Sequence, residues 1–250
     1  MIEVKNLSCT FSYGMASTQL TAVSPITVSF QSGKRYAIVG ESGSGKTTLA
    51  RMIAGLQKPS CGNVYVDGNP VYTKAGNDHF RKVQLVQQNS ASALDPKMTI
   101  GKSIEEPLVC FLRLDRLERR KRCGKLLELC NLPPGYYNRL PSELSGGEQK
   151  RVAIARALAV EPDCMIFDEA TNGFDLPLRK KIIEEILDLQ ESLDFTLIFI
   201  THDMELAVAV ADEIMVMQNS VLVEHTPFSG DTSVFHHEYS KILLFASGLT

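Results

Sequence analysis

The sequence predicts an α/β fold with a parallel sheet, and three observations carry this prediction. Two short, continuously apolar runs, Cys164–Phe167 and Thr196–Ile200, are typical of strands that are buried on both faces. The segment between them, Leu176–Leu193, has apolar residues at helical spacing, which gives a strand–helix–strand unit. A glycine-rich loop, Gly40–Thr47, also separates a strand pattern from a helix pattern.

The composition is that of an ordinary globular protein. The 250 residues are 44% hydrophobic and 22% charged, and the formal net charge of −3 gives no electrostatic reason to expect nucleic acid or an acidic membrane as a partner. No apolar run approaches the roughly 18 residues of a membrane-spanning helix, and Met1–Lys5 does not resemble a secretion signal. The six cysteines form no CxxC pair and the five histidines show no ligand spacing, so we expect reduced thiols.

Near the N-terminus, two apolar patterns flank a short polar turn. Thr27–Phe30 precedes the turn Gln31–Gly33, and Tyr36–Val39 follows it. This arrangement predicts a β-hairpin, and Thr48–Ala54 then opens a helix beyond the glycine-rich loop.

The loop Gly40–Thr47 matches the pattern G-x-x-x-x-G-K-[ST] of a P-loop. Glycines let backbone N–H groups turn toward phosphate oxygens, and the N-terminus of the next helix adds unpaired donors and positive partial charge. We expect Lys46 to hold the β- and γ-phosphates of a nucleotide, and the Thr47 hydroxyl to ligate Mg²⁺. The residues expected to contact the nucleotide here are Gly40, Ser42, Gly43, Gly45, Lys46, Thr47 and Thr48.

The middle third of the chain, from Gly101 to about Leu140, has helical patterns and little strand pattern. Much of one helix is basic, which fits a solvated face, with contact to nucleic acid or lipid headgroups as the alternative. Pro133–Gly135 ends that helix, so a helical lobe at about residues 90–155 is expected to be inserted into the α/β core. The apolar face of the helix consists of Cys123, Leu126, Leu127 and Cys130.

The segment Leu144–Arg151 decides between the classes of P-loop protein. It resembles the LSGGQ signature of ATP-binding cassette (ABC) proteins, with Glu148 in the last place of the motif. Ser145 offers a hydroxyl, and Gly146 and Gly147 expose backbone N–H groups at the start of a helix. The chain therefore carries a second helix terminus suited to an anion.

Further segments resemble motifs of the ABC family in the family's order. The resemblance implies that Asp168 holds Mg²⁺ at the end of a Walker B strand, and that Glu169 is the general base for the attacking water. It implies that His202 touches the γ-phosphate. It also implies that Gln88 senses Mg²⁺ and the attacking water, with Gln87 as the alternative.

Two further assignments concern the adenine and the D-loop. The resemblance implies that Phe11 stacks on adenine, with Tyr13 as the alternative residue. The alternative role for Phe11 is that of an ordinary core residue. Asp175 matches the aspartate of the D-loop, whereas Asn172–Phe174 and Ala170 depart from the family's pattern.

A finer resemblance is to the importers of peptides and nickel. Asn89–Pro96, Glu106–Leu108 and His237–Leu244 are similar to segments of that class, with Glu238 in place of a proline. The short tail and the Asp168–Ala170 variant are closer to the nickel or metallophore branch.

The resemblance implies one ABC nucleotide-binding domain over residues 1–250. It would have a P-loop NTPase (RecA-like) core, an N-terminal antiparallel β subdomain and the inserted helical subdomain. The implied activity is that of an ATPase, which uses ATP and Mg²⁺ to energise an importer of nickel ion, a metal chelate or an oligopeptide.

The resemblance also implies partners. These are permease subunits in the membrane and a second ATPase subunit, either a paralogue or a copy of this chain, in a head-to-tail dimer. An extracytoplasmic solute-binding protein would act indirectly, and no nucleic acid is expected. The chain would lie peripherally on the cytoplasmic face of the cell membrane. The ATPase of an exporter, a soluble ABC ATPase without a transport role, and a P-loop kinase or regulatory module are the alternatives.

Overall fold

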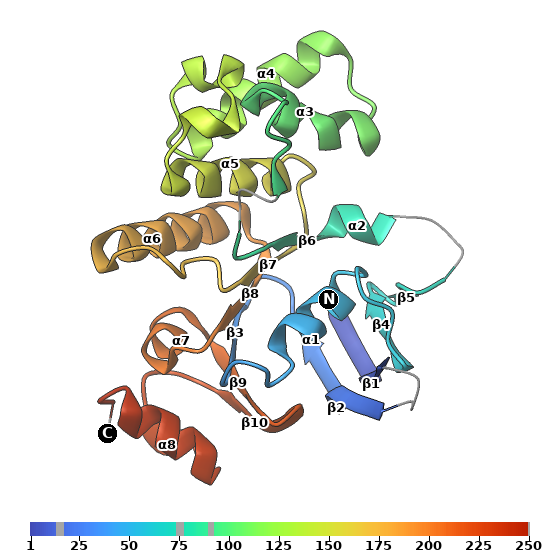
Figure 1. The fold of residues 1–250 in the computed structure, drawn as a ribbon, viewed down its shortest axis with the longest axis vertical. Helices are drawn as coiled ribbons and strands as arrows, with labels where there is room; N and C mark the ends of the chain where they lie inside the picture. Colours follow the sequence, from blue (N-terminus) through green and yellow to red (C-terminus); the bar gives the residue numbers. More distant parts are fainter. Residues whose placement is uncertain (14–17, 74–77, 90–92, 250) are drawn as a thin grey trace.

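The computed structural model describes residues 1–13, 18–73, 78–89 and 93–249, and these form two sheets flanked by helices (Figure 1). The first sheet is antiparallel, with the strand order β2-β1-β4-β5. Its strands are β1 Ile2–Tyr13, β2 Thr18–Phe30, β4 Cys61–Val66 and β5 Asn69–Pro70.

The second sheet has the order β10-β9-β3-β8-β7-β6. All of its pairings are parallel except that of β10 with β9, which is antiparallel. The predicted apolar runs at Cys164–Phe167 and Thr196–Ile200 are confirmed as strands of this sheet, and both strands are buried throughout. Its strands are β3 Arg35–Val39, β6 Val83–Val86, β7 Cys164–Asp168, β8 Thr196–Thr201, β9 Glu213–Gln218 and β10 Val221–Pro227.

The hairpin expected between Thr27–Phe30 and Tyr36–Val39 is wrong. The first segment ends β2 and pairs with β1, whereas the second belongs to β3 and lies between β8 and β9 in the other sheet. The reason is burial: Tyr36 and Ile38 face one hydrophobic cluster while Ala37 and Val39 face another. A strand that is apolar on both faces needs the centre of a covered parallel sheet, and a two-stranded ribbon cannot provide that.

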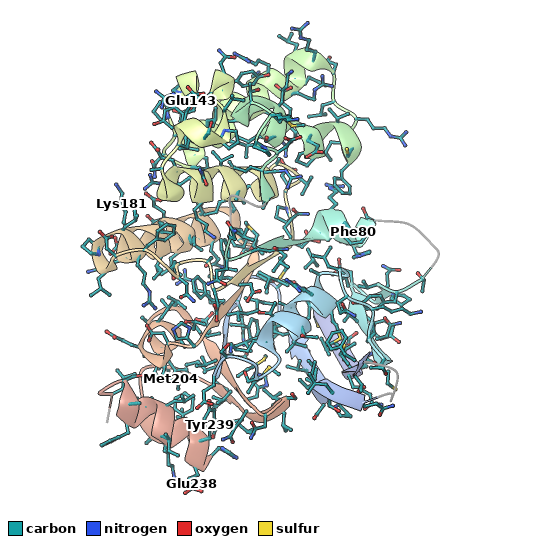
Figure 2. The ribbon with its side chains drawn as sticks, viewed as in Figure 1. Phe80, Glu143, Lys181, Met204, Glu238 and Tyr239 are labelled. Atoms are coloured by element: carbon teal, nitrogen blue, oxygen red, sulfur yellow. The ribbon has the colours of Figure 1, made fainter. Side chains whose placement is uncertain are left out.

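Helices cover both faces of the parallel sheet. Helix α1 (Lys46–Ile53) packs between the two sheets, in a cluster that contains strands of both. Helices α7 (Met204–Val210) and α8 (Glu238–Ala246) pack on the opposite face of β3 and β9, where Met204 and Tyr239 are buried together (Figure 2). The short helix α2 (Asp78–Lys82) leads into β6.

The predicted helical lobe is formed by α3 (Ile100–Cys110), α4 (Arg116–Leu129) and α5 (Gly146–Leu158), with 3₁₀ turns between α4 and α5. Asp115 caps α4 and forms a capping box with Glu118. The apolar face predicted for α4 is confirmed, since its four residues are at most 7% exposed. These residues are Cys123, Leu126, Leu127 and Cys130.

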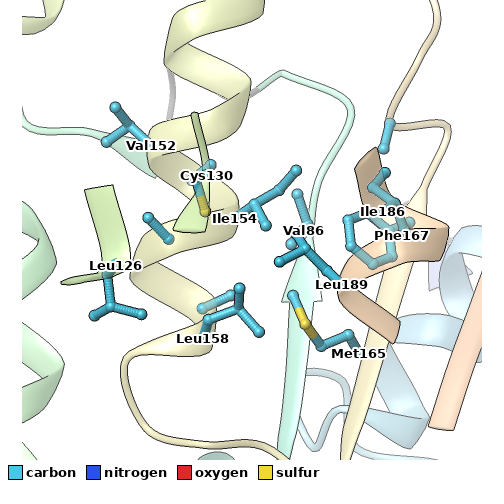
Figure 3. Packing of buried hydrophobic residues seen from close by; sticks show 14 of the residues in the cluster. Val86, Leu126, Cys130, Val152, Ile154, Leu158, Met165, Phe167, Ile186 and Leu189 are labelled. Atoms are coloured by element: carbon cyan, nitrogen blue, oxygen red, sulfur yellow. The ribbon is translucent and has the colours of Figure 1, made fainter. Parts of the chain in front are cut away.

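Helix α5 joins the lobe to the sheet (Figure 3). Its side chains share one cluster with Leu126 of α4, Val86 of β6, and residues of β7 and α6 (Leu176–Leu193). The core of the lobe is therefore continuous with the core beneath the sheet, and α5 belongs to both. All six cysteines are free thiols. Within the described residues, no helix is both long and apolar enough to cross a membrane.

Candidate nucleotide site

The P-loop connects β3 to the N-terminus of α1, as the sequence predicts. Gly45 has φ of 97°, and a Cβ atom there would lie 2.1 Å from the carbonyl oxygen of Ala22. A Cβ atom at Gly40 would lie 2.1 Å from the carbonyl oxygen of Met217. Larger residues are therefore excluded at both glycines, because the loop packs directly on the backbone of two neighbouring segments.

Lys46 is 4% exposed, and its ammonium is held by the loop itself. Nζ donates hydrogen bonds to the carbonyl oxygens of Gly40 (2.7 Å) and Glu41 (2.6 Å) and lies 3.3 Å from the hydroxyl of Ser44. Burial lowers the pKa of Lys46, and the nearby carboxylates of Glu169, Asp168 and Glu41 act in the opposite direction. The loop thus fixes a cation at the centre of a ring of backbone groups.

Thr47 and Asp168 place two oxygen ligands side by side. The Thr47 hydroxyl, at the start of α1, donates a hydrogen bond of 3.0 Å to Asp168 Oδ1 at the end of β7. Asp168 is 6% exposed, and burial raises its pKa although the Thr47 hydrogen bond lowers it. A buried carboxylate of this kind gains from a bound cation, and hydroxyl and carboxylate oxygens are the ligands that Mg²⁺ prefers. The pair therefore fits the Mg²⁺ site that the sequence predicts.

Glu169 follows Asp168 in a left-handed conformation, with φ of 48°. Its backbone N–H donates to the carbonyl oxygen of Ile200 in β8 (3.0 Å), which holds this uncommon conformation. Its carboxylate accepts a hydrogen bond of 2.8 Å from the Asn172 side chain, and the other carboxylate oxygen lies 3.6 Å from His202 Nδ1. The structure therefore brings Glu169 and His202 together and adds Asn172 as a group that orients the carboxylate.

The signature lies at the N-terminus of α5. Ser145 caps this helix, and both its N–H (2.8 Å) and its hydroxyl (2.7 Å) donate to Glu148 Oε2. The hydroxyl of Tyr136 donates to the other oxygen of Glu148. The Tyr136 hydrogen bond, followed by those of Ser145, lowers the pKa of Glu148 to about 2. Glu148 is therefore an anion that the start of α5 and the lobe hold jointly.

Comparison with known proteins agrees with this geometry. Residues 23–172 match the family described as ABC transporter. The dipeptide transport ATP-binding protein DppF of Haemophilus influenzae is 35% identical over 234 residues, which are 92% of this chain and 71% of that protein. The nickel import ATP-binding protein NikE of Escherichia coli is 34% identical over 249 residues, which are 97% of this chain and 92% of that protein.

The chain belongs to the ABC transporter family. It is one of the family's ATPase subunits, and the resemblance that the sequence motifs suggest is confirmed. A dimeric ATP-binding cassette in a post-hydrolysis state, bound to ADP and Pi, matches the fold with a TM-score of 0.81 at 31% identity, covering 92% of this chain and 100% of that one. The protein cbiO1 of Clostridium perfringens, part of an ABC transporter complex, matches with a TM-score of 0.79 at 26% identity, covering 99% and 91%.

In this ABC ATPase, the signature and the P-loop lie on different parts of the chain. Figure 1 shows that α5, at the base of the helical lobe, is well separated from α1. The D-loop and the start of α6 instead pack on the signature. A Cβ atom at Gly146 would lie 3.4 Å from the ring of Phe174, and a Cβ atom at Gly147 would lie 3.4 Å from the side chain of Leu178. Asp175 caps α6 by accepting a hydrogen bond from the Leu178 N–H (3.1 Å). The P-loop and the signature are therefore two separate places within one chain.

The adenine and Q-loop assignments remain predictions. Phe11 lies in β1, is partly buried and packs against the cluster that contains α1. The side chain of Tyr13 lies outside the part of the chain that the structure describes. Gln87 and Gln88 follow β6 and both are exposed, so the geometry does not choose between them. Of the extension at Asn89–Pro96, residues 90–92 lie outside the described part.

Sequence reasoning missed three residues that organise the ABC motifs. Asn172 and Tyr136 position carboxylates that the sequence identifies, but these contacts depend on how loops fold back. The third is Lys150, which is 0% exposed and donates to the backbone of Gln87 and Gln88. Burial lowers the pKa of Lys150 to about 8, while Asp168 acts to raise it. In the sequence it looks like part of a basic pair with Arg151, and nothing local to it indicates burial.

Proposed function

We propose that this chain binds ATP with Mg²⁺ at its P-loop, hydrolyses the nucleotide in a dimer with a second ATPase subunit, and thereby energises an importer. The observation that carries the proposal is the group at the ends of β7 and β8, where Glu169 faces His202 at 3.6 Å and Asn172 orients the carboxylate. Beside it lie the paired oxygens of Thr47 and Asp168.

On the phosphate side, Lys46 would exchange its bonds to loop carbonyls for the β- and γ-phosphate oxygens. Thr47, Asp168 and the Q-loop glutamine Gln88 would hold Mg²⁺, which neutralises charge on the phosphates. The N–H groups of the loop would face the phosphates, and the residues that supply or flank them are Gly40, Ser42, Gly43, Gly45 and Thr48. Phe11 would stack on the adenine, with Tyr13 as the alternative.

In the reaction, Glu169 would accept a proton from the attacking water. Its carboxylate is held from one side by Asn172, so a single oxygen is left to face the water and His202. His202 is more than half exposed, so its ring is open to the γ-phosphate. The γ-phosphoryl group would pass directly to water, without a covalent intermediate on the protein. The protein would contribute by positioning the reactants and by stabilising the developing charge.

A second subunit follows from the separation of the two half-sites. Ser145, Gly146 and Gly147 at the N-terminus of α5, with Asp175 beside them, would complete the site on the partner, while the partner's signature would complete this one. The partner is a copy of this chain or a related ATPase subunit. The dimeric cassette with 31% identity supports this arrangement.

A permease helix has a fitting place beside the Q-loop. A cavity of about 310 Å³ lies there, between β6 and the helical lobe. Phe111, which is 39% exposed, and Pro107 give its wall apolar character, and Arg156 and Gln87 give it polar groups. A chain docked there would lie peripherally on the cytoplasmic face of the membrane, with a solute-binding protein acting on the other side. The names of the relatives support peptides or nickel, free or chelated, as cargo.

The test is to isolate the tagged chain from native membranes in mild detergent and identify its companions by mass spectrometry. Permease subunits with a second ATPase subunit and a solute-binding protein are expected, together with ATP hydrolysis that the loaded binding protein stimulates. Recovery in the soluble fraction without membrane partners would reject the transport role. Companion permeases without any binding protein would reject import.

A further inference from the structure

Lys150 lies on α5, about one and a half turns after the signature serine Ser145. Its side chain is fully buried and runs toward the sheet. Nζ donates to the carbonyl oxygens of Gln87 at 2.8 Å and of Gln88 at 3.1 Å. These two carbonyls belong to the segment that leaves β6, which ends at Val86.

A buried amine at this place has an energetic cost. Desolvating an ammonium is unfavourable unless hydrogen bonds or an anion compensate for it, and an apolar side chain of similar size avoids the cost. Within the described residues, no carboxylate lies within 4.0 Å of Lys150 to form an ion pair. The two carbonyls of the Q-loop therefore compensate for its burial by direct hydrogen bonds, and the carboxylate of Asp168 adds attraction from a greater distance.

The contact joins two motifs with different tasks. Gln88 is the residue proposed to sense Mg²⁺ and water at the chain's own nucleotide. Ser145, at the start of the same helix as Lys150, is proposed to contact the nucleotide of the partner. A side chain fixed to α5 that holds the backbone at Gln87 and Gln88 transmits a displacement of one motif directly to the other.

We propose that Lys150 is a positioning residue that ties the Q-loop backbone to the signature helix, so that Gln88 and Ser145 move as one unit. The proposal rests on the proposed function, because it assigns the two motifs to two nucleotides. It does not require Lys150 to touch ATP, water or Mg²⁺. Lys150 acts through the backbone that carries Gln88.

The test compares Lys150→Met, which keeps most of the unbranched side chain and removes the donors, with Lys150→Gln, which keeps a shorter donor. We expect Lys150→Met to lower kcat by about 10-fold to 100-fold, the effect of misplacing a group by about 1 Å. The KM for ATP and the ATP affinity of the isolated chain should stay within about twofold, because the P-loop is intact. Amide exchange in residues 83–89, measured without nucleotide, should be faster, and Lys150→Gln should lie between Lys150→Met and the wild type in both measurements.

Two control variants separate positioning from general stability. Val152→Ala loosens the same helix at a fully buried site on the face opposite Lys150 (Figure 3). Lys181→Met removes a lysine from an exposed position of α6 (Figure 2). Neither should change exchange in residues 83–89. If Val152→Ala lowers kcat as much as Lys150→Met at an equal loss of melting temperature, the positioning role is wrong.

Unchanged kcat and exchange in Lys150→Met would also overturn the proposal. Should Lys150→Met fail to fold, Lys150→Gln decides: wild-type exchange in residues 83–89 would overturn the proposal, and faster exchange with a lower kcat would support it. Failure of the proposed function would give a different result, because the wild-type chain itself would then neither bind nor hydrolyse ATP. The exchange measurement needs no nucleotide and still reports on the contact in that case.

Discussion

Individual residues at the ends of β7 and β8 carry the proposed chemistry. Glu169 is held in a left-handed conformation by a hydrogen bond to the neighbouring strand, and its carboxylate is aimed by Asn172. The backbone at this corner is strained so that one carboxylate points at a defined place, which is a common feature of reaction sites.

Replacing Glu169 with Gln should lower kcat by about 10²-fold to 10⁴-fold, the usual contribution of a general base. ATP binding should persist, because Lys46 and Thr47 are unchanged. Single-turnover hydrolysis and nucleotide binding measure the two effects. Glu191→Gln, an exposed residue on α6, is the matched control, and near-normal turnover in Glu169→Gln would contradict the role of Glu169.

Replacing Asn172 with Ala should have a smaller effect of the same kind. The carboxylate of Glu169 loses its 2.8 Å donor and becomes free to rotate, so we expect kcat to fall by about 10-fold with little change in KM. Steady-state kinetics decide this. An Asn172→Ala enzyme with a raised KM and a normal kcat would show that Asn172 serves binding and not the orientation of Glu169.

At the scale of elements, helix N-termini carry both structure and function. Ser145→Ala should abolish most hydrolysis in the dimer and leave ATP binding to the isolated chain unchanged, because its nucleotide lies on the partner. The substitution also removes a helix cap, which costs about 1 kcal/mol. Asp115→Ala removes the cap of α4 at a similar cost and away from the site, so it should retain hydrolysis. Equal losses in the two variants would attribute the effect of Ser145 to stability alone.

Helix α4 offers a second test at this scale. Leu127 is fully buried, so Leu127→Ala should lower the free energy of unfolding by about 2–5 kcal/mol. Leu117 on the same helix is 79% exposed, and Leu117→Ala should change the free energy of unfolding by less than about 0.5 kcal/mol. Denaturant unfolding measures both. Equal effects would mean that α4 does not bury the face assigned to it.

The sequence predicts elements well where local pattern decides them. Helical periodicity and a content rich in Lys, Glu and Leu give the bounds of α6, and short apolar runs give β7 and β8. It fails at the hairpin because strand pairing is set by distant segments: β3 pairs with β8 and β9. The motif residues at the P-loop and Walker B strand are likewise found by spacing, whereas Lys150 and Asn172 act through contacts that only the folded chain creates.

For the whole molecule, the separation of P-loop and signature predicts assembly driven by ATP. With saturating ATP, the mass of the Glu169→Gln variant measured by light scattering should double. If the partner is a copy of this chain, the variant alone should dimerise, and if it is a related subunit, the change should require that subunit. ADP should not support this, since the γ-phosphate is what the signature would contact. A wild-type chain that stays monomeric while hydrolysing ATP at full rate would contradict a shared site.

The central place of β3 also governs when the protein can mature during its synthesis. Its residues, 35–39, are made before the strands on either side of it, which end at residues 201 and 218. At about 5–20 residues per second, the ribosome needs roughly 10 to 35 s to supply those neighbours. Until then the strand that supports the P-loop lacks both of its neighbours, so the nascent chain exposes an apolar segment and we expect it to gain nucleotide affinity only after β9 has been made.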